Sequence, residues 1–177
     1  MIAEANWESE ESMSVHNISG FVKFTQRSSE DPVVVSVEIN GIPEGFHGFH
    51  VHEKAIEDFG EDVMACCDKL GGHFNVGEKW SLENKNGTKH GIKGHNGDLC
   101  NNIYSKDGKC SHYFNDDMIS LYPDDPRCIV GRSIVIHEDI DDMALPTYTD
   151  EKKEIGKLIT GNAGKRIACG NILVCKI

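Results

Sequence analysis

Alternation of apolar and polar residues with a period of two is the main pattern along the chain. In Val33–Ile39 the odd-numbered positions are all apolar and would share one face of an extended strand. Further strands are expected at Ile2–Trp7, Phe21–Gln26, Phe46–His52, Ile134–His137 and Asn171–Ile177. No stretch keeps an apolar period of 3.6 residues over a dozen positions. The pattern therefore predicts an all-β fold, either a sandwich or a barrel.

The connections between these strands differ greatly in length. Lys106–Lys109 contains the Asp-Gly pair of a tight hairpin, whereas residues 8–17 are polar and are expected to form a mobile loop. Three long segments show little periodicity: Glu53–Gly72, Phe74–Gly97 and Glu138–Arg166. Loops of this length in a compact domain are usually functional or disordered. Because histidines and aspartates lie in or beside them, we expect metal ions to order these loops.

Length and charge narrow the class of protein. The 177 residues suffice for one domain, so a single domain is expected over residues 1–177. Eighteen Lys and Arg against 29 Asp and Glu give a net charge of −11, which disfavours nucleic acid and anionic membranes as partners. No apolar run is long enough to span a bilayer, and the acidic N-terminus lacks a signal-peptide core. The expected location is the cytoplasm.

Cysteine and histidine carry the candidate chemistry. Seven cysteines leave at least one thiol without a partner in the same chain, and none forms a CxxC pair. Eight of the nine histidines lie between residues 47 and 137, and seven of these fall in or beside the predicted strands and long loops: His47, His50, His52, His73, His90, His95 and His137.

His50 and His52 share one face of a predicted strand, roughly 7 Å apart, and can converge on one ion. Alone, such a pair is more often an ordinary polar strand face. His95 and Asp98 add an imidazole and a carboxylate three residues apart, which suits zinc, while an imidazole-rich set suits copper. His47 is out of register with the pair and is expected to bond to the backbone.

Five sequence blocks resemble the signature blocks of the copper–zinc superoxide dismutases, in the order of that family. They are Gly45–Glu53, Gly72–Asn75, Gly97–Leu99, Gly131–Glu138 and Gly161–Gly170. The resemblance extends over residues 19–177, whereas the first 18 residues match poorly. It implies an eight-stranded Greek-key β-barrel or sandwich with long metal-binding and electrostatic loops. The implied activity is antioxidant: superoxide becomes dioxygen and hydrogen peroxide by alternate reduction and oxidation of a histidine-bound copper bridged to zinc.

The same resemblance implies a role for each matching residue. The copper ligands would be His50, His52, His73 and His137. The zinc ligands would be His73, His90, His95 and Asp98. Arg166 would hold the superoxide anion, His73 would be a catalytic bridge between the metals, and Asp141 would link a copper-ligand imidazole to a zinc-ligand imidazole. A homodimer is implied through Gly60, Gly131 and Ile172–Val174, with a copper-loading helper protein as a further partner.

Two positions leave alternatives open. Sixteen residues separate His73 from His90, about twice the interval usual in the family, and Ser81 occupies the usual offset. Serine is a poor zinc ligand, so His90 is preferred. The alternative is a surface His90 and a zinc held by three protein groups. The implied disulfide joins Cys169 to either Cys66 or Cys67, and Cys67 is preferred because it keeps the usual offset to His73.

Two further departures concern charge near the metal site. Family members commonly carry lysines where this chain has Asp139 and Ile159, so weaker attraction of the superoxide anion is expected.

A competing hypothesis is a copper-delivery or catalytically silent protein on the same fold. Such relatives usually lack a copper ligand or carry an added domain, and this chain keeps all four histidines and Arg166. A purely structural β-sandwich would leave seven metal-type residues unexplained.

Overall fold

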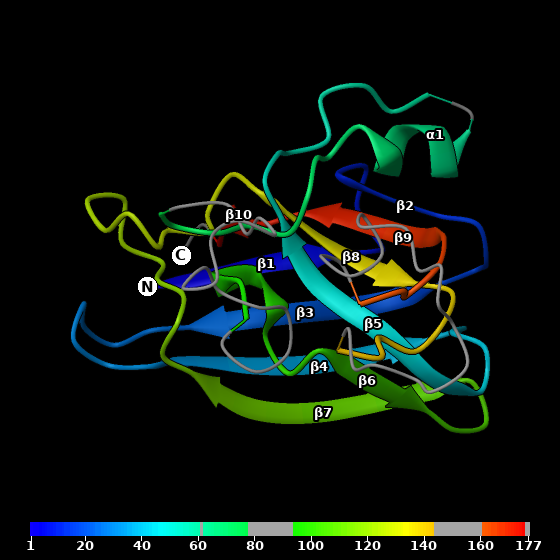
Figure 1. Ribbon diagram of the computed structural model, residues 1–177, viewed down its shortest axis with the longest axis horizontal. Helices are drawn as coiled ribbons and strands as arrows, with labels where there is room; N and C mark the ends of the chain where they lie inside the picture. Colours follow the sequence, from blue (N-terminus) through cyan, green and yellow to red (C-terminus); the bar gives the residue numbers. More distant parts are fainter. Residues whose placement is uncertain (61, 78–93, 144–160, 176–177) are drawn as a thin grey trace, which may run out of the picture.

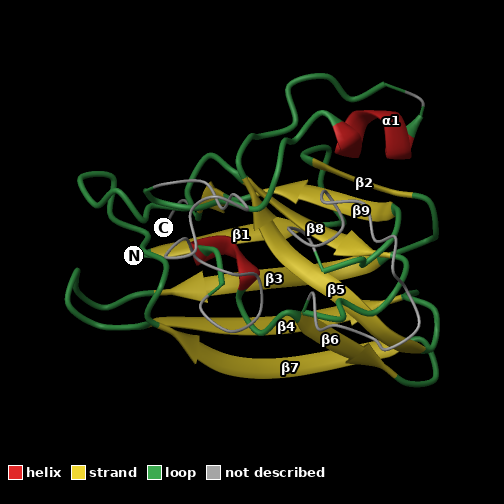
Figure 2. Cartoon of the chain, viewed as in Figure 1, coloured by secondary structure: helices red, strands yellow, loops and turns green. Residues whose placement is uncertain are grey.

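A computed structural model of the protein shows two antiparallel sheets packed face to face, with a short helix outside them (Figure 1). It describes residues 1–60, 62–77, 94–143 and 161–175. The described strands are β1 (Ile2–Asn6), β2 (Ser12–Ser14), β3 (Ser19–Thr25), β4 (Val33–Asn40), β5 (Gly45–His52), β6 (Asn102–Ser105), β7 (Lys109–Asp116), β8 (Ser133–His137), β9 (Arg166–Asn171) and β10 (Leu173–Val174). The helical elements are α1 (Val63–Asp68) and a 3₁₀ helix at Asn96–Asp98 (Figure 2).

Each sheet contains five strands. Their orders are β10-β1-β3-β4-β7 and β2-β9-β8-β5-β6. Eight strands are four to eight residues long, while β2 and β10 are shorter and extend one edge of each sheet. Among the described residues, no strand pairs with both sheets. The all-β prediction is confirmed, and the architecture is a sandwich whose sheets do not close into a barrel.

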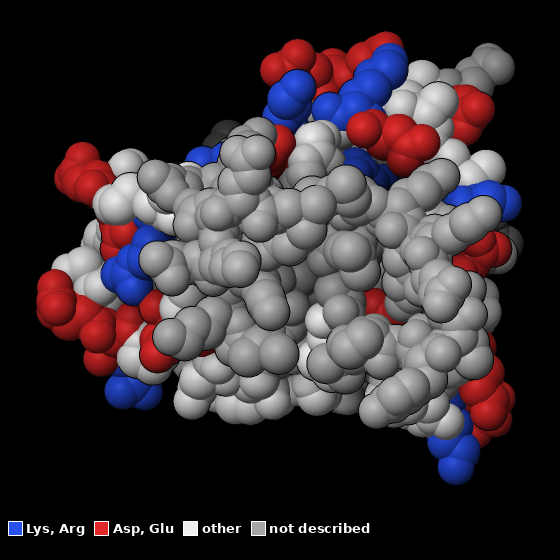
Figure 3. Space-filling view, viewed as in Figure 1, with Lys and Arg blue, Asp and Glu red and all other residues white. Residues whose placement is uncertain are grey.

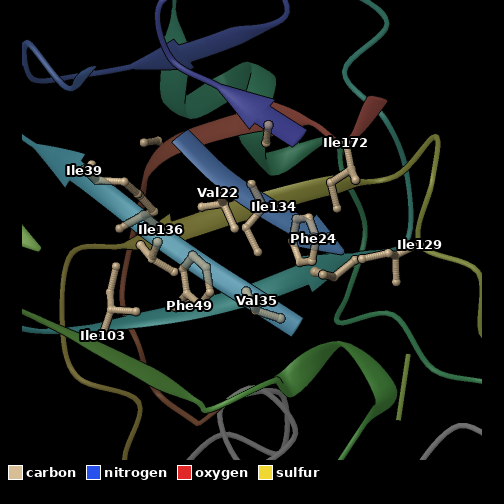
Figure 4. Close-up of a cluster of buried hydrophobic side chains, with 14 of the residues drawn as sticks. Val22, Phe24, Val35, Ile39, Phe49, Ile103, Ile129, Ile134, Ile136 and Ile172 are labelled. Atoms are coloured by element: carbon tan, nitrogen blue, oxygen red, sulfur yellow. The ribbon is translucent and has the colours of Figure 1, made fainter. Parts of the chain in front are cut away.

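The core lies between the inner faces of the two sheets. The expected alternation in β4 is confirmed, because Val33, Val35, Val37 and Ile39 are all buried. Figure 4 shows Val35 and Ile39 among the side chains of β3 and of the facing strands β5 and β8. Fully burying an aliphatic or aromatic side chain of this size stabilises the fold by roughly 1.5–3 kcal/mol. This packing makes β5 and β8 a rigid support for the histidines they carry.

Three local expectations need correction. The strand expected at Asn171–Ile177 is confirmed only in part: Asn171 ends the longer strand β9, Leu173–Val174 form β10, and residues 176–177 lie outside the described residues. β9 is buried on both faces and so lacks the alternation that marks a half-exposed strand. Residues 8–17 are not simply a loop, since β2 pairs with β9. Helix α1 spans six residues, too few for a helical period to be detected.

The hairpin expected at Lys106–Lys109 is confirmed and joins β6 to β7. Asp107 and Gly108 have φ angles of 52° and 72°, the left-handed conformation that two-residue hairpin turns require. No helix in the described part of the chain is long and apolar enough to cross a membrane.

Candidate metal centre

Four histidines from different parts of the sequence meet in one buried group. His50 and His52 lie on β5, and His137 ends the neighbouring strand β8. His73 belongs to the loop after α1 and is held beside His52 by an isolated antiparallel bridge. One ring nitrogen from each histidine lies within 4.8 Å of the corresponding nitrogens of the other three, and all four side chains are buried. The pairing of β5 with β8 and the loop bridge therefore assemble the predicted set.

Backbone carbonyls determine which nitrogen of two of these rings faces the group. Nδ1 of His52 donates to the carbonyl of Gly71 at 3.1 Å, and Nδ1 of His137 donates to that of Gly164 at 3.3 Å. The Nε2 atoms of both rings are buried, with no hydrogen-bond partner among the described residues. A neutral imidazole that donates through one nitrogen offers a lone pair at the other. Both Nε2 atoms can therefore bind a metal ion.

His50 is oriented by a carboxylate. Its Nε2 lies 2.7 Å from Oδ2 of Asp141, so Nδ1 would be its ligand atom. Asp141 is in turn fixed by Asn102, whose amide accepts from the Asp141 backbone N–H at 2.7 Å and donates to its carbonyl at 3.0 Å. The sequence predicted Asp141 but missed Asn102, because an asparagine on a strand carries no signal for this contact.

A second group shares His73 with the first. His73 Nδ1 lies 2.6 Å from Oδ1 of Asp98, and His95 Nδ1 lies 3.3 Å from the same oxygen. The 3₁₀ helix that carries Asp98 packs against β5 at Gly97, where an added Cβ would lie 2.2 Å from the Val51 carbonyl. The predicted ligand His90 lies outside the described residues, as does Ser81, which occupies the offset usual in the family.

Burial keeps the ligand nitrogens unprotonated. It lowers the pKa of His137 to about 3 and that of His52 well below 6.5. The charge of His73 lowers both values further, and Arg166 contributes in the same direction. Desolvation disfavours the charged form of a histidine, and only the neutral form can bind a metal. Both side chains are therefore ready to act as ligands at neutral pH.

The donor sets of the two groups fit copper and zinc. Four imidazoles form a nitrogen-only set, which suits copper, and two histidines with an aspartate form a set typical of zinc. The buried Nε2 atoms of His52 and His137 would be costly without a partner, and a metal ion supplies one. Because His73 presents Nδ1 to Asp98, its Nε2 is the nitrogen left for the four-histidine group.

Arg166 lies at the edge of this site. Its guanidinium donates to the carbonyls of Cys67 and Gly71, both at 2.7 Å, and its side chain is 17% exposed. The Gly71 carbonyl thus accepts from both Arg166 and His52. The contacts place a fixed positive charge beside the histidines with part of its surface open to solvent. Such a fork is suited to holding a small anion.

The structure resolves the cysteine alternative. A disulfide joins Cys67 to Cys169, and Cys66 is a buried free thiol. The bond ties α1 to β9 within a second apolar cluster that includes Ile56, Leu70 and Val135. It thereby fixes the loop whose carbonyls hold Arg166.

Of the other residues singled out, His47 and Asp139 are described, whereas Ile159 is not. His47 bonds to the backbone carbonyls of His137 and Pro43 at 2.8 and 2.9 Å, so its predicted structural role is confirmed. Asp139 lies beside Gly164, because a Cβ added to this glycine would lie 2.5 Å from Oδ2 of Asp139. Gly164 precedes Arg166 by two residues in the chain.

Comparisons with known proteins agree with this geometry. The family model described as copper/zinc superoxide dismutase matches residues 18–172. The chain is 38% identical over 160 residues to superoxide dismutase [Cu-Zn] 5 of Dictyostelium discoideum, covering 90% of this chain and 93% of that protein. It is 37% identical over 155 residues to an extracellular superoxide dismutase [Cu-Zn] of Drosophila melanogaster, covering 88% and 75%.

The fold also resembles a solved structure. The crystal structure of the clock protein EA4 aligns with a TM-score of 0.70 at 33% sequence identity, covering 98% of this chain and 94% of that one.

Proposed function

The chain belongs to the copper/zinc superoxide dismutase family, and on this premise we propose a role for each residue around the two metal groups. The activity is dismutation of superoxide to dioxygen and hydrogen peroxide, with copper and zinc as cofactors. Copper supplies the electron transfer by changing oxidation state, whereas zinc has no redox chemistry. The observation that carries the assignment of ligands is the convergence of four buried histidines, two of them with Nε2 atoms that lack a hydrogen-bond partner in the described structure.

The proposed copper ligands are the four histidines of the first group: His50, His52, His73 and His137. The proposed zinc ligands are His73, His95, Asp98 and, outside the described residues, His90. Replacing His90 with Ala would then lower zinc content and thermal stability together, because metal binding orders the loop. Unchanged zinc content would assign His90 to the surface.

His73 is proposed to move a proton during the reaction. Its two nitrogens face different groups, Nδ1 toward Asp98 and Nε2 toward the other histidines. Nε2 is therefore the atom at which a proton can be held and given to the reduced oxygen species. Asp141 is proposed to support this arrangement by holding His50 in the orientation described above.

Arg166 is proposed to hold superoxide while it reacts. Two carbonyls fix the guanidinium, and its exposed fraction leaves room for a small anion. Arg166→Gln should lower the rate of superoxide decay about ten- to a hundredfold, the loss expected for one charge-assisted contact. Copper content should not change, because Arg166 is not a ligand. The control is Arg27→Gln, which removes the same charge from an exposed residue that follows β3. Equal rates of superoxide decay in the two variants would contradict the proposed role of Arg166.

A two-fold dimer is proposed through Gly60 and through the surface formed by Gly131, Leu173 and Val174. The Gly131 N–H donates to the carbonyl of Ile172, which places these residues side by side. Ile172 itself is buried within the monomer, whereas the side chains of Leu173 and Val174 are 43% and 48% exposed. Isologous pairing of such a patch is the commonest form of oligomer. Light scattering at micromolar concentration should give twice the chain mass, and a monomer mass would refute the proposal.

We also propose that the protein works in the cytoplasm. Five cysteines are free in the described structure, a usage typical of a reducing compartment, although one disulfide is present. The Drosophila relative is named as extracellular. Fractionation of the source cells tests the proposal, and recovery of the protein from the medium would contradict it. Need for a copper-loading helper protein stays a prediction.

A further inference from the structure

A carboxylate lies next to the guanidinium that is proposed to bind the anion. Oδ1 of Asp68 is 3.8 Å from Nε of Arg166. The Asp68 side chain is 70% exposed, so its charge remains in solvent at this short distance from the guanidinium. Figure 3 shows acidic and basic side chains intermingled around α1, the helix that ends at Asp68.

Neither the helix nor the position of Arg166 requires this carboxylate. Asp68 is the last residue of α1, where a negative charge is unfavourable because the helix dipole is negative at that end. Two hydrogen bonds of 2.7 Å to backbone carbonyls already hold Arg166. An exposed ion pair near 4 Å adds little to them. What Asp68 contributes is a negative charge beside the anion site.

We infer that Asp68 is a specificity-determining residue, which makes the anion site at Arg166 discriminate against doubly charged anions in favour of singly charged ones. The inference rests on the proposed role of Arg166. Coulomb repulsion is proportional to the charge of the incoming anion, so Asp68 disfavours a dianion twice as strongly, in free energy, as a monoanion.

This discrimination matters because of the chemistry of arginine. A guanidinium fork binds phosphate oxygens through two parallel hydrogen bonds, so a partly exposed arginine is also a site for hydrogen phosphate. Superoxide carries one negative charge and hydrogen phosphate carries two. A nearby carboxylate weakens the binding of both anions, but it weakens the binding of hydrogen phosphate more. Asp68 would thus keep Arg166 available to superoxide at the expense of some affinity for it.

The test compares two variants of the copper- and zinc-loaded protein, Asp68→Asn and Asp58→Asn. Asp58 is a matched control because it is 71% exposed, lies on the same long loop and pairs with Lys69 rather than with Arg166. Each variant removes one negative charge. Azide is the singly charged probe, followed by the absorption of copper. Hydrogen phosphate is the doubly charged probe, measured by its displacement of azide at low salt and above the second pKa of phosphate.

We expect Asp68→Asn to tighten azide binding about two- to threefold, as expected for one unit charge several ångström away in water. The affinity for hydrogen phosphate should rise by the square of that factor, about four- to ninefold. High salt should reduce both changes. Asp58→Asn should leave both affinities close to those of the unaltered protein. Asp68→Ser should match Asp68→Asn and serves as the second variant if the first fails to fold.

The inference would be overturned if Asp68→Asn raised the affinities for azide and hydrogen phosphate by the same factor. It would also be overturned if the Asp68 and Asp58 variants had equal effects. Superoxide decay measured on the same samples separates it from the proposed function. An unaltered protein that does not dismute superoxide would overturn the proposed function alone, since anion affinities still decide the role of Asp68. An active protein with identical affinities in both variants would overturn the role of Asp68 alone.

Discussion

At the scale of single residues, hydrogen bonds to each histidine decide which nitrogen can bind a metal. Carbonyls of Gly71 and Gly164 accept from Nδ1 of His52 and His137, and Asp141 accepts from Nε2 of His50. Spacing alone indicated only the pairs His50–His52 and His95–Asp98, and the full set of four histidines and Asp141 came from the resemblance to the family. The sequence could not predict the carbonyl acceptors, since every residue has a carbonyl and only the fold decides which one lies beside a ring.

Buried neutral histidines should make the stability of the metal-free protein depend on pH. The pKa of His137 is lowered to about 3 in the folded state, whereas an unfolded histidine titrates near 6.5. Between these values only the unfolded state binds the proton, so unfolding is favoured as pH falls. The free energy of unfolding should decrease from about pH 6.5 toward pH 3, by up to ~1.4 kcal/mol per pH unit for each such histidine.

Urea unfolding of the metal-free protein across this range measures the slope. His137→Gln should make the dependence shallower, whereas His112→Gln, at an exposed residue of β7, should not change it. The same slope in all three proteins would show that the buried histidine does not cause the dependence.

At the scale of elements, alternation made β4 predictable, whereas β9, which is buried on both faces, lacks that pattern and was missed. β4 alternates strictly and was placed correctly, whereas β9 is almost wholly buried and reads as a run of small and apolar residues. β2 was missed because a three-residue polar edge strand has no pattern of its own. Its partner, β9, lies more than 150 residues away in the chain. The disulfide from the first long loop to Cys169 was predicted from resemblance alone, and the preferred partner, Cys67, is confirmed.

The disulfide should be a major source of stability for the elements that support Arg166. Cys67 and Cys169 are separated by 102 residues, and closing a loop of that length restricts the unfolded chain. In the chain-entropy model the gain is about 4–5 kcal/mol. Cys67→Ser should therefore lower the free energy of unfolding by an amount near this value in urea titrations.

Cys66→Ser is the matched control, because Cys66 is the adjacent buried cysteine and is not bonded. It should retain the disulfide and most of the stability. Loss of similar size in both variants would mean that packing around the cysteines, rather than the bond, stabilises this region.

At the scale of the whole molecule, net charge opposes the substrate. A charge of −11 repels superoxide, so fast capture needs a local positive potential near Arg166. Asp139 occupies a position where relatives commonly carry a lysine, and it lies beside Gly164. The second such position, Ile159, lies outside the described residues. Contact with Arg166 acts at short range, whereas steering acts over a Debye length of about 10 Å at 0.1 M salt. Steering should therefore be weaker than in relatives that carry both lysines.

Replacing Asp139 and Ile159 together by Lys should raise the rate of superoxide decay at low salt and steepen its fall with added salt. The expected cause is a local gain of positive charge, which screening then removes. Superoxide decay measured against ionic strength in both proteins gives the two slopes. Equal slopes would mean that other lysines supply the field.

The central claim is that copper held by His50, His52, His73 and His137, next to zinc, dismutes superoxide. Metal content and superoxide decay measured on one sample, purified with both metals present, test this claim most directly. We expect one copper and one zinc per chain and rapid catalytic decay, which is lost when copper is removed and regained when copper is restored. Full copper occupancy without catalytic decay would contradict the claim and identify the protein as a silent copper-binding member of the family.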